Sequence, residues 1–449
     1  MVQGATSSAG KSLITTGLAR LLRRRGVDVV PFKAQNMSNN ARVVNGGEIG
    51  TAQYLQALAA GVEPDVRMNP ILVKPEGDNR SQVIVLGRAD AELSRLPWRA
   101  RRGALWPVIA AALAELQSEH EFVLLEGAGS PAEINLRDTD LANMRTAKEA
   151  GARVLLVADI DRGGAFASLY GTWALLPADE RELIDGFVLN KFRGDATLLP
   201  PGPERLRELT GVPTIGVLPW FAHALPDEDG AFVTNKGAGP VVGVVRYPTA
   251  SNLDELKPIE EVARLRWVRT PGDLTGIDLV VLPGSKHVAG DLAWLRATGL
   301  AAAVEGGSVP LLGICGGMQM LGERIDDPHC LDGAADGLGL LAVRTTFSRT
   351  KTTRLVDGTF GVLEGFWRPL SGAAFRGYEI RHGSNTGLVE ASGRVLGVAF
   401  HGLFEQPDLV ERILGRAPET SLDAVFDGLA DAIELHLDLE AILPGRVTR

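Results

Sequence analysis

The sequence predicts two α/β domains, each built around a largely parallel β-sheet. Short apolar runs alternate with segments of helical periodicity along most of the chain, which is the pattern of strand–helix–strand units. The length of 449 residues exceeds what one hydrophobic core usually organises. The periodicity lapses between residues 226 and 240, where turn-forming residues gather. We therefore expect one domain at residues 1–230 and a second at residues 240–449.

The first domain is expected to hold a doubly wound parallel sheet. Its predicted strands are the apolar runs at residues 27–32, 122–125, 154–158, 186–189 and 214–218. Such runs are typical of strands buried on both faces. Apolar residues at helical spacing in residues 13–24, 50–60 and 105–116 predict the crossover helices that join parallel strands. In a sheet of this kind the functional loops lie at the carboxyl ends of the strands.

The second domain repeats the alternation of strands and helices. Its predicted strands are at residues 241–245, 279–282, 309–314 and 395–400, and residues 338–389 are more typical of hairpins. Apolar residues near helical spacing in residues 421–443 predict a terminal helix that packs on a core. Docking to another protein is the alternative for that helix.

Composition and charge exclude several classes of protein. The net charge of −9 argues against a nucleic-acid binder, and the basic cluster at residues 20–25 is interpreted as the solvated face of a helix. Two cysteines, Cys315 and Cys330, rule out a disulfide framework and indicate a reducing compartment. No signal peptide precedes Gly4, and no apolar stretch is long enough to span a membrane. We expect a cytoplasmic protein that acts on small molecules.

The first ligand site is predicted at residues 4–12, GATSSAGKS, which precede an apolar helix. In a P-loop, backbone N–H groups near Gly10 surround phosphate oxygens, Lys11 neutralises their charge and the Ser12 hydroxyl binds Mg²⁺. Five residues separate Gly4 from Gly10, one more than usual. The alternative, a glycine-rich helix cap, is disfavoured by the strand–loop–helix context. The loop therefore predicts ATP binding.

Acidic residues follow two strands of the same domain. Glu126 ends the run at residues 122–125 and precedes a glycine turn. A carboxylate at this strand end, across from a P-loop, is well placed to hold Mg²⁺. Asp159 and Asp161 follow the next strand, and metal, water and substrate are all open as their ligand.

The second site is predicted at Cys315, where the apolar run at residues 309–314 ends in a Gly-x-Cys-x-Gly turn. A strand that feeds such a turn and then a helix lifts the side chain out of the sheet for nucleophilic attack. A thiol needs a base, because a free cysteine is mostly protonated at neutral pH. His401 follows another strand and is the best candidate for that base.

The thiol site also needs donors for the oxyanion that forms on attack. The N–H groups of Gly284, in a loop after a strand, and of Gly316 are expected to supply them. Gln319 lies one helical turn beyond Cys315 and is a candidate ligand for the substrate. The alternatives are a buried core thiol for Cys315 and a helix-surface amide for Gln319. A thiol that opens an amide and a loop that binds ATP together predict a glutamine-dependent amide former.

Several motifs resemble those of one family, the cobyric acid synthases, which are glutamine-hydrolysing enzymes of adenosylcobalamin biosynthesis. The motifs are FKAQNMSNN (32–40), GGEIG (46–50), MNP (68–70), KP (74–75), EGAGSPAEINL (126–136), DIDRGG (159–164), NKFRG (190–194), LPGSK (282–286), LGICGGMQMLG (312–322) and HGLF (401–404). They cover nearly the whole chain. The first is highly specific, since the related cobyrinic acid a,c-diamide synthases carry a different sequence there.

The resemblance implies a P-loop domain similar to dethiobiotin synthetase, whose loop has the longer glycine spacing, followed by a class I-like glutamine amidotransferase domain. It implies that Cys315 is the nucleophile, that His401 is the active-site histidine and that Asn190 reads the adenine edge. The family amidates the b, d, e and g carboxylates of adenosylcobyrinic acid a,c-diamide, with ATP and glutamine for each, to give adenosylcobyric acid.

The resemblance also leaves specific positions to explain. Leu403 stands where triad amidotransferases carry glutamate, and the family shares this feature, so a Cys–His dyad is expected and Glu405 has no assigned part. Arg381 stands where the family usually carries histidine, so His382 is its possible substitute. Contacts to the corrinoid are expected from Asn36, Lys74, Ser81 and Gln82.

Two other functions are weighed against this one. An amidotransferase acting on the a,c positions or on a cell-wall lipid carboxylate is disfavoured by FKAQNMSNN. A P-loop regulatory ATPase with an inactive glutaminase-like domain is disfavoured by the intact Cys315 and His401.

Overall fold

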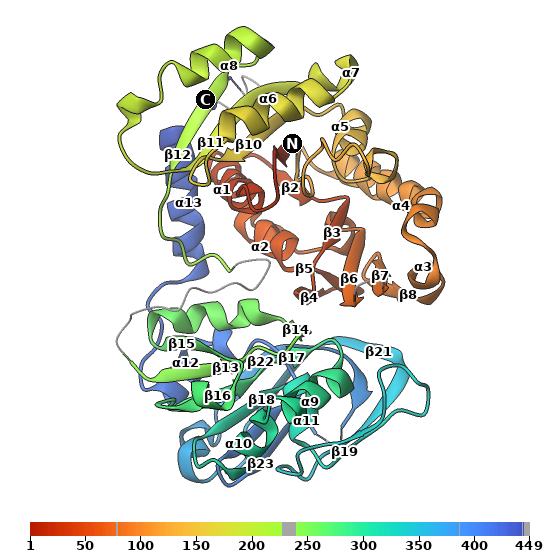
Figure 1. The fold of residues 1–449 in the computed structure, drawn as a ribbon, viewed down its shortest axis with the longest axis vertical. Helices are drawn as coiled ribbons and strands as arrows, with labels where there is room; N and C mark the ends of the chain where they lie inside the picture. The colour runs from red at the N-terminus through yellow and green to blue at the C-terminus, as the bar shows by residue number, and fades with distance from the viewer. Residues whose placement is uncertain (78–79, 227–238, 386, 442, 444–449) are drawn as a thin grey trace.

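The protein consists of two α/β bodies stacked along its long axis (Figure 1). The structure is a computed structural model, and it describes residues 1–77, 80–226, 239–385, 387–441 and 443. Most of the expected domain boundary at 226–240 therefore lies outside the described residues. The α/β fold class with parallel sheets in both halves is confirmed.

The first half is organised by parallel strands in the order β2-β9-β1-β10-β11-β12. Its strands are β1 (Val2–Gly4), β2 (Val29–Phe32), β9 (Phe122–Leu125), β10 (Val154–Asp159), β11 (Ile184–Phe192) and β12 (Thr214–Pro219). The β2–β9 pair joins the other four through Gly127, whose N–H donates to the Val2 carbonyl at 2.9 Å. The helices are α1 (Lys11–Arg24), α2 (Thr51–Ala60), α4 (Trp98–Glu119), α5 (Met144–Ala150), α6 (Ala165–Leu175), α7 (Ala178–Arg181) and α8 (Gly202–Thr210).

Short strands between β2 and α4 were not predicted from the sequence. They are β3 (Gln35–Met37), β4 (Ala41–Val44), β5 (Gly47–Gly50), β6 (Ile71–Gly77), β7 (Arg80–Val85) and β8 (Arg88–Asp90), followed by α3 (Ala91–Arg95). Strands β3, β6, β7 and β8 form one sheet, and β4 pairs with β5. None of these strands has more than three consecutive apolar residues, which is shorter than the apolar runs that predicted the other strands. In Figure 1 they lie at the end of the first half that faces the second half.

The second half contains a six-stranded sheet in the order β15-β13-β16-β18-β24-β23. Its strands are β13 (Val241–Val245), β15 (Arg264–Val268), β16 (Leu279–Leu282), β18 (Leu311–Ile314), β23 (Val389–Ser392) and β24 (Val395–Val398), and β23 is the antiparallel one. A second sheet contains β19 (Arg324–Asp326), β20 (Ala335–Asp336), β21 (Arg344–Thr359) and β22 (Ala374–Ser384). The helices include η4 (Leu253–Glu261), α9 (Val288–Ala297), α10 (Leu300–Gly306), α11 (Gly316–Leu321), η7 (Leu403–Glu405) and α12 (Pro407–Leu414).

The last helix, α13 (Leu422–His436), returns to the first half and packs along α1 (Figure 1). Phe426, Leu429 and Ile433 are buried in the same hydrophobic core as Ile14 and Leu18. On the outer side of this contact, Arg20 and Arg24 of α1 form ion pairs with aspartates of α13. The terminal helix expected to pack on a core does so, but on the core of the first half rather than that of the second. Among the residues described, none of the helices combines the length and apolar character needed to cross a membrane.

Candidate functional site

Cys315 lies at a sharp turn between β18 and α11. Its backbone has φ 50° and ψ −104°, a conformation that side chains rarely adopt and that stores strain. The Cys315 N–H donates to the Val398 carbonyl at 2.7 Å, which fixes the turn against β24. A Cβ on Gly317 would lie 2.0 Å from the Leu282 carbonyl oxygen, so only glycine fits there. The predicted elbow is therefore present and is anchored to both neighbouring strands.

His401 lies three residues beyond the end of β24 and contacts the Cys315 thiol. Its Nδ1 atom is 2.8 Å from Oε1 of Glu255. The second carboxylate oxygen of Glu255 accepts the Gly402 N–H at 2.9 Å. All three side chains are buried, with His401 2% and Glu255 1% exposed. Glu255 thus holds the imidazole ring at one nitrogen and leaves the other for the thiol.

The electrostatics favour a thiolate beside an imidazolium. Burial lowers the pKa of His401, but the charges of Glu255 and Cys315 more than reverse this and raise the pKa to about 10. Burial raises the pKa of the Cys315 thiol, but the charge and hydrogen bond of His401 outweigh it and leave the pKa below its ordinary value. Because the pair exchanges one proton, we place that proton on His401 near neutral pH.

The expected Cys–His dyad therefore requires a correction, because Glu255 supplies a third residue. It comes from η4, 146 positions before His401. The carboxyl ends of β13, β16, β18 and β24, which are parallel neighbours, lead to Glu255, Gly284, Cys315 and His401. The sequence feature that could have identified Glu255 is the acidic pair Asp254–Glu255. This pair follows the first strand of the domain, at the same sheet edge as the other strand ends.

The two predicted oxyanion donors lie beside the thiol. A Cβ on Gly316 would be 2.8 Å from the Ser285 nitrogen, and one on Gly284 would be 2.8 Å from Cε1 of His401. Gly284 therefore approaches His401, and Gly316, which directly follows Cys315, approaches the loop that contains Gly284. Gln319 is 2% exposed, and its Nε2 atom is buried without a hydrogen-bond partner. Gln319 is therefore a buried amide near the thiol rather than a helix-surface one.

Arg381, His382, Glu405 and Cys330, which were also considered from the sequence, each have a different setting. The Arg381 Nε atom donates to Glu379 at 2.7 Å, and its charge contributes to lowering the pKa of Cys315. His382 instead lies against Gln82 of the first half. Glu405 pairs with Arg42, also of the first half. Cys330 is exposed and lies in a turn.

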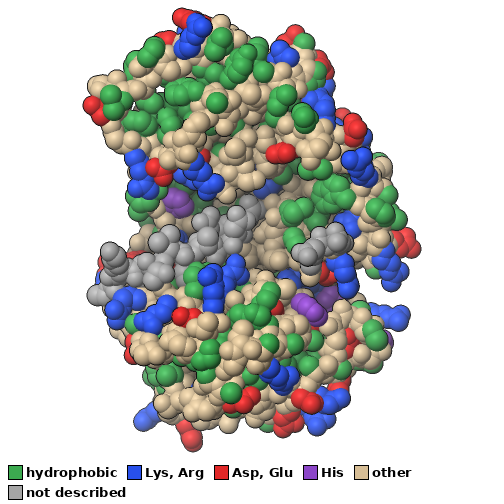
Figure 2. Space-filling view, viewed as in Figure 1, with side chains coloured by type: hydrophobic (Ala, Val, Ile, Leu, Met, Phe, Trp, Pro, Cys, Tyr) green, Lys and Arg blue, Asp and Glu red, His purple; other side chains and the backbone are tan. Residues whose placement is uncertain are grey.

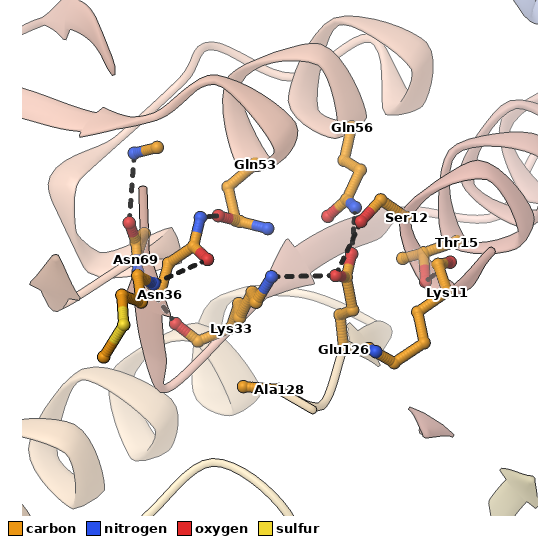
Figure 3. A network of polar contacts seen from close by, with 12 residues as sticks. Lys11, Ser12, Thr15, Lys33, Asn36, Gln53, Gln56, Asn69, Glu126 and Ala128 are labelled. Atoms are coloured by element: carbon orange, nitrogen blue, oxygen red, sulfur yellow. Dashed lines mark hydrogen bonds and ion pairs between the residues drawn. The ribbon is translucent and has the colours of Figure 1, made fainter. Parts of the chain in front are cut away.

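The phosphate loop faces a buried polar network at the carboxyl end of β9 (Figure 3). Ser12 Oγ donates to Oε1 of Glu126 at 2.8 Å, and Lys33 Nζ lies 2.9 Å from the same oxygen. Gln56 donates to the other carboxylate oxygen. Lys11 donates to the Gly129 carbonyl at 3.2 Å, across the loop. The sequence predicted Lys11, Ser12 and Glu126 as neighbours, whereas Lys33 and Gln56 were missed because only the fold brings them here.

Asn190 closes the other side of the loop. Its Nδ2 atom donates to the Ala9 carbonyl at 2.9 Å and would lie 2.0 Å from a Cβ on Gly10. Gly10 has φ 100°, which also requires glycine. Lys191 donates to the Ser8 carbonyl at 2.8 Å and lies 2.9 Å from Asp159. The NK motif therefore anchors the loop.

A cavity of about 1070 Å³ opens beside this loop. It is lined by residues of the P-loop, by Asn36 and Glu126, by Asp159 and Asp161, and by Lys257 and Glu260 of η4. The surface is hollowed between the two halves of the molecule in Figure 2. Lys74 instead forms an ion pair with Glu48, which also pairs with Lys351. Gln82 accepts a hydrogen bond from Lys351, and Ser81 accepts one from Arg101. Of the four expected corrinoid contacts, only Asn36 lines this cavity.

The donor set at the loop fits Mg²⁺. A hydroxyl and a carboxylate oxygen approach each other at Ser12 and Glu126, and Asp159 lines the same cavity. Mg²⁺ is typically held by one or two protein oxygens together with phosphate and water. The described part of the chain contains no group of three or more His, Cys, Asp or Glu side chains that could form an all-protein metal site.

Two family models match the chain, one in each half. A family described as "CobQ/CobB/MinD/ParA nucleotide binding domain" matches residues 1–228, and "CobB/CobQ-like glutamine amidotransferase domain" matches residues 241–409. A "Cobyric acid synthase" of Polaromonas sp. (strain JS666 / ATCC BAA-500) is 54% identical over 98% of this chain and 96% of its own. That of Variovorax paradoxus (strain S110) is 54% identical over 98% and 97%. A solved glutamine amidotransferase shares 20% identity over 38% of this chain and 98% of its own, with a TM-score of 0.29.

Identity of this degree over nearly the full length of both chains, together with a glutamine amidotransferase domain, indicates an enzyme of the glutamine-dependent ligase class. The chain belongs to the cobyric acid synthase family.

Proposed function

We propose that this protein amidates the b, d, e and g carboxylates of adenosylcobyrinic acid a,c-diamide with ammonia from glutamine, at the expense of ATP, to give adenosylcobyric acid. The observation that carries the proposal is the presence in one chain of a P-loop facing a large cavity and a Cys–His–Glu cluster at the edge of a second sheet. The name of its relatives, cobyric acid synthase, supports the choice of substrate.

In this proposal the first domain, residues 1–230, activates the acceptor carboxylate. Lys11 and the backbone N–H groups near Gly10 bind the phosphates of ATP, and Ser12 and Glu126 hold Mg²⁺. The ion neutralises charge that develops on the transferred phosphoryl group. The carboxylate oxygen of the corrinoid attacks the γ-phosphorus and forms an acyl phosphate, with ADP as the leaving group. Asn190, which lines the same cavity, reads the adenine edge.

The second domain, residues 240–449, supplies ammonia. The Cys315 thiolate attacks the amide carbon of glutamine, and the N–H groups of Gly284 and Gly316 stabilise the oxyanion. His401 gives its proton to the departing nitrogen, which leaves as ammonia. The acyl group remains on Cys315 as a thioester. His401 then accepts a proton from water, which attacks the thioester and releases glutamate. Glu255 keeps the imidazole oriented through both steps.

Two further residues complete the proposed chemistry. Gln319 binds the glutamine substrate, because its buried Nε2 atom has no hydrogen-bond partner and the residue lies one helical turn beyond Cys315. The ammonia moves inside the protein to the acyl phosphate, attacks its carbonyl carbon and displaces phosphate, which completes one amide.

Mass analysis of a reaction with the purified protein, the corrinoid a,c-diamide, ATP and glutamine tests the proposal. The expected result is a product whose mass corresponds to four new amides, with glutamate and ADP released for each. No added amide would defeat the substrate assignment. Release of glutamate from glutamine would then still distinguish an amidotransferase with another acceptor from a protein without glutaminase activity.

A further inference from the structure

Arg42 belongs to β4 in the first half of the chain, yet its guanidinium reaches into the second half. It forms ion pairs with Asp254 and Glu405. Its Nη1 atom also donates to the Tyr378 hydroxyl at 2.8 Å. The side chain is buried, with Arg42 4% exposed. One residue of the first half is therefore built into the core of the contact between the halves.

Each partner of Arg42 belongs to a segment that also contains or contacts Glu255 or His401. Asp254 directly precedes Glu255 in η4, which holds His401. Tyr378 exchanges two backbone hydrogen bonds with His401, at 3.1 and 2.9 Å, and their rings stack with centroids 5.4 Å apart. Glu405 ends η7, the short helix that begins after Gly402, whose N–H donates to Glu255. Arg42 thus connects the three segments that surround the imidazole.

Other contacts tie η4 to the first half. Thr51 Oγ1 donates to Asp254 at 3.4 Å, and Asn252 Nδ2 donates to the Ala41 carbonyl at 3.3 Å. At the other end of η4, Lys257 and Glu260 line the cavity beside the phosphate loop. The same short helix therefore borders both sites.

The charge balance makes Arg42 hard to replace. Burial lowers the pKa of its guanidinium, but Asp254 and Glu405 reverse this, so the side chain stays charged. A planar guanidinium can bond two carboxylates and a hydroxyl at once, which a lysine ammonium does with less geometric control. Without Arg42, the buried carboxylate of Asp254 would lose its cation, the partly exposed Glu405 would lose its partner, and η4 would lose the contact that sets its position.

We propose that Arg42, from the synthetase half, is a positioning residue for glutamine hydrolysis: it holds η4 and η7 so that Glu255 can orient His401. The inference rests on the glutaminase function proposed above. It implies that glutamine hydrolysis depends on the docked first half, whereas the activation of the acceptor does not depend on Arg42.

The test compares full-length Arg42→Met and Arg42→Lys with a matched control, Arg20→Met. Arg20 also joins the first half to the end of the chain, through Asp423 and Asp427, but on the outer side of α13. Glutamate release is measured against glutamine concentration, and amide formation from ammonium salt reports on the first half. We expect Arg42→Met to lower kcat for glutamate release about 10- to 100-fold, as a small misplacement of catalytic groups does. The KM for glutamine and ammonia-dependent synthesis should stay within about threefold.

Rescue of the Arg42 variants distinguishes a positioning role of Arg42 from an effect on folding. Arg42→Lys should retain more activity than Arg42→Met, and free ethylguanidinium should partly restore an Arg42→Ala variant, while Arg20→Met stays at the level of the unmodified protein. If Arg42→Met does not fold, Tyr378→Phe replaces it, because that change removes only the hydroxyl, which accepts from Arg42 and from Asn252; it should lower kcat at least about threefold through the lost hydrogen bonds.

An unchanged kcat in Arg42→Met, or in Tyr378→Phe where that variant takes its place, overturns the inference. Equal losses in glutamate release and ammonia-dependent synthesis would assign Arg42 a structural role only and also overturn it. Absence of glutamate release from the unmodified protein would be a failure of the proposed function instead, so the two failures are distinguishable.

Discussion

Nδ1 of His401 lies 2.8 Å from Oε1 of Glu255, although the two residues are 146 positions apart in the chain. This pair gives the thiol site a carboxylate that the residues following His401 do not provide. A carboxylate at this nitrogen fixes the orientation and tautomer of the imidazole and stabilises its charged form. The charge of Glu255 in this contact also contributes to raising the pKa of His401.

Changing Glu255 to Gln should therefore slow glutamate release at least about tenfold at neutral pH, since general acid–base catalysis depends on a correctly oriented imidazole. The amide keeps the size of the side chain and removes its charge. Steady-state assays of glutamate release, with circular dichroism to verify folding, measure the effect. Activity within about twofold of the unmodified protein would exclude an orienting role for Glu255.

The pH dependence of thiol reactivity provides a second prediction. Because the pKa of Cys315 is below its ordinary value, the thiolate persists as pH falls, and the acid limb of alkylation by iodoacetamide should lie below about 8.5. Glu255→Gln removes a charge that raises the pKa of His401. Less imidazolium then remains to stabilise the thiolate, so the pKa of Cys315 rises and the acid limb moves to higher pH.

This experiment uses a Cys330→Ser background, because Cys330 is exposed and is the second of the two cysteines. Mass spectrometry of the alkylated Cys315 peptide across the pH range gives the titration directly. A limb that stays in place, or moves to lower pH, in Glu255→Gln would contradict the assigned thiolate–imidazolium pair.

Replacing Cys315 by Ala should abolish glutamine-dependent synthesis and leave ammonia-dependent synthesis largely intact. The thiol is needed only to release ammonia, and the acyl phosphate forms at the other site. Product formation with glutamine and with ammonium salt as alternative nitrogen sources provides the comparison. An equal loss with both sources would contradict the proposed separation of the two chemistries.

Lys11→Met should have the opposite effect. Loss of its charge at the phosphate loop should reduce synthesis with either nitrogen source about 100-fold or more, because phosphoryl transfer depends on such fixed charges. Glutamate release in the absence of acceptor should stay within about threefold of the unmodified protein. A comparable loss of glutamate release would mean that Lys11 also supports the thiol site.

The packing of α13 predicts an effect on stability far from either site. Ile433 is 1% exposed and packs near Gly17 of α1, where a Cβ would lie 2.8 Å from its Cγ1 atom. Ile433→Ala should lower the free energy of unfolding by about 2–5 kcal/mol through lost burial and a cavity. Leu435 is on the same helix but 77% exposed, so Leu435→Ala should change the free energy of unfolding by less than about 0.5 kcal/mol. Denaturant titration of both variants measures the difference; similar values would contradict the packing described for α13.

Much of the framework was accessible from the sequence because its signals are local. Runs such as residues 122–125 and 241–245 are apolar over the length of a buried strand, and the structure has strands at those bounds. The elbow at Cys315 and the loop before Lys11 depend on glycine at positions where a side chain would collide, so their sequence patterns are distinctive. Strand β3, QNM, is polar, and β4, ARVV, is only four residues long with an arginine inside it, so both were missed.

The sequence by itself determined the α/β class, the phosphate loop, the thiol elbow and the histidine that serves it, because each is specified by neighbouring residues. Only the tertiary structure decided that Glu255 meets His401, that Lys33 and Gln56 meet Glu126, and that Arg42 joins the halves. The physical reason is that parallel strands bring their carboxyl ends to one edge in the order of the sheet, not of the chain. Charged groups far apart in sequence become partners there because burial requires each charge to be paired.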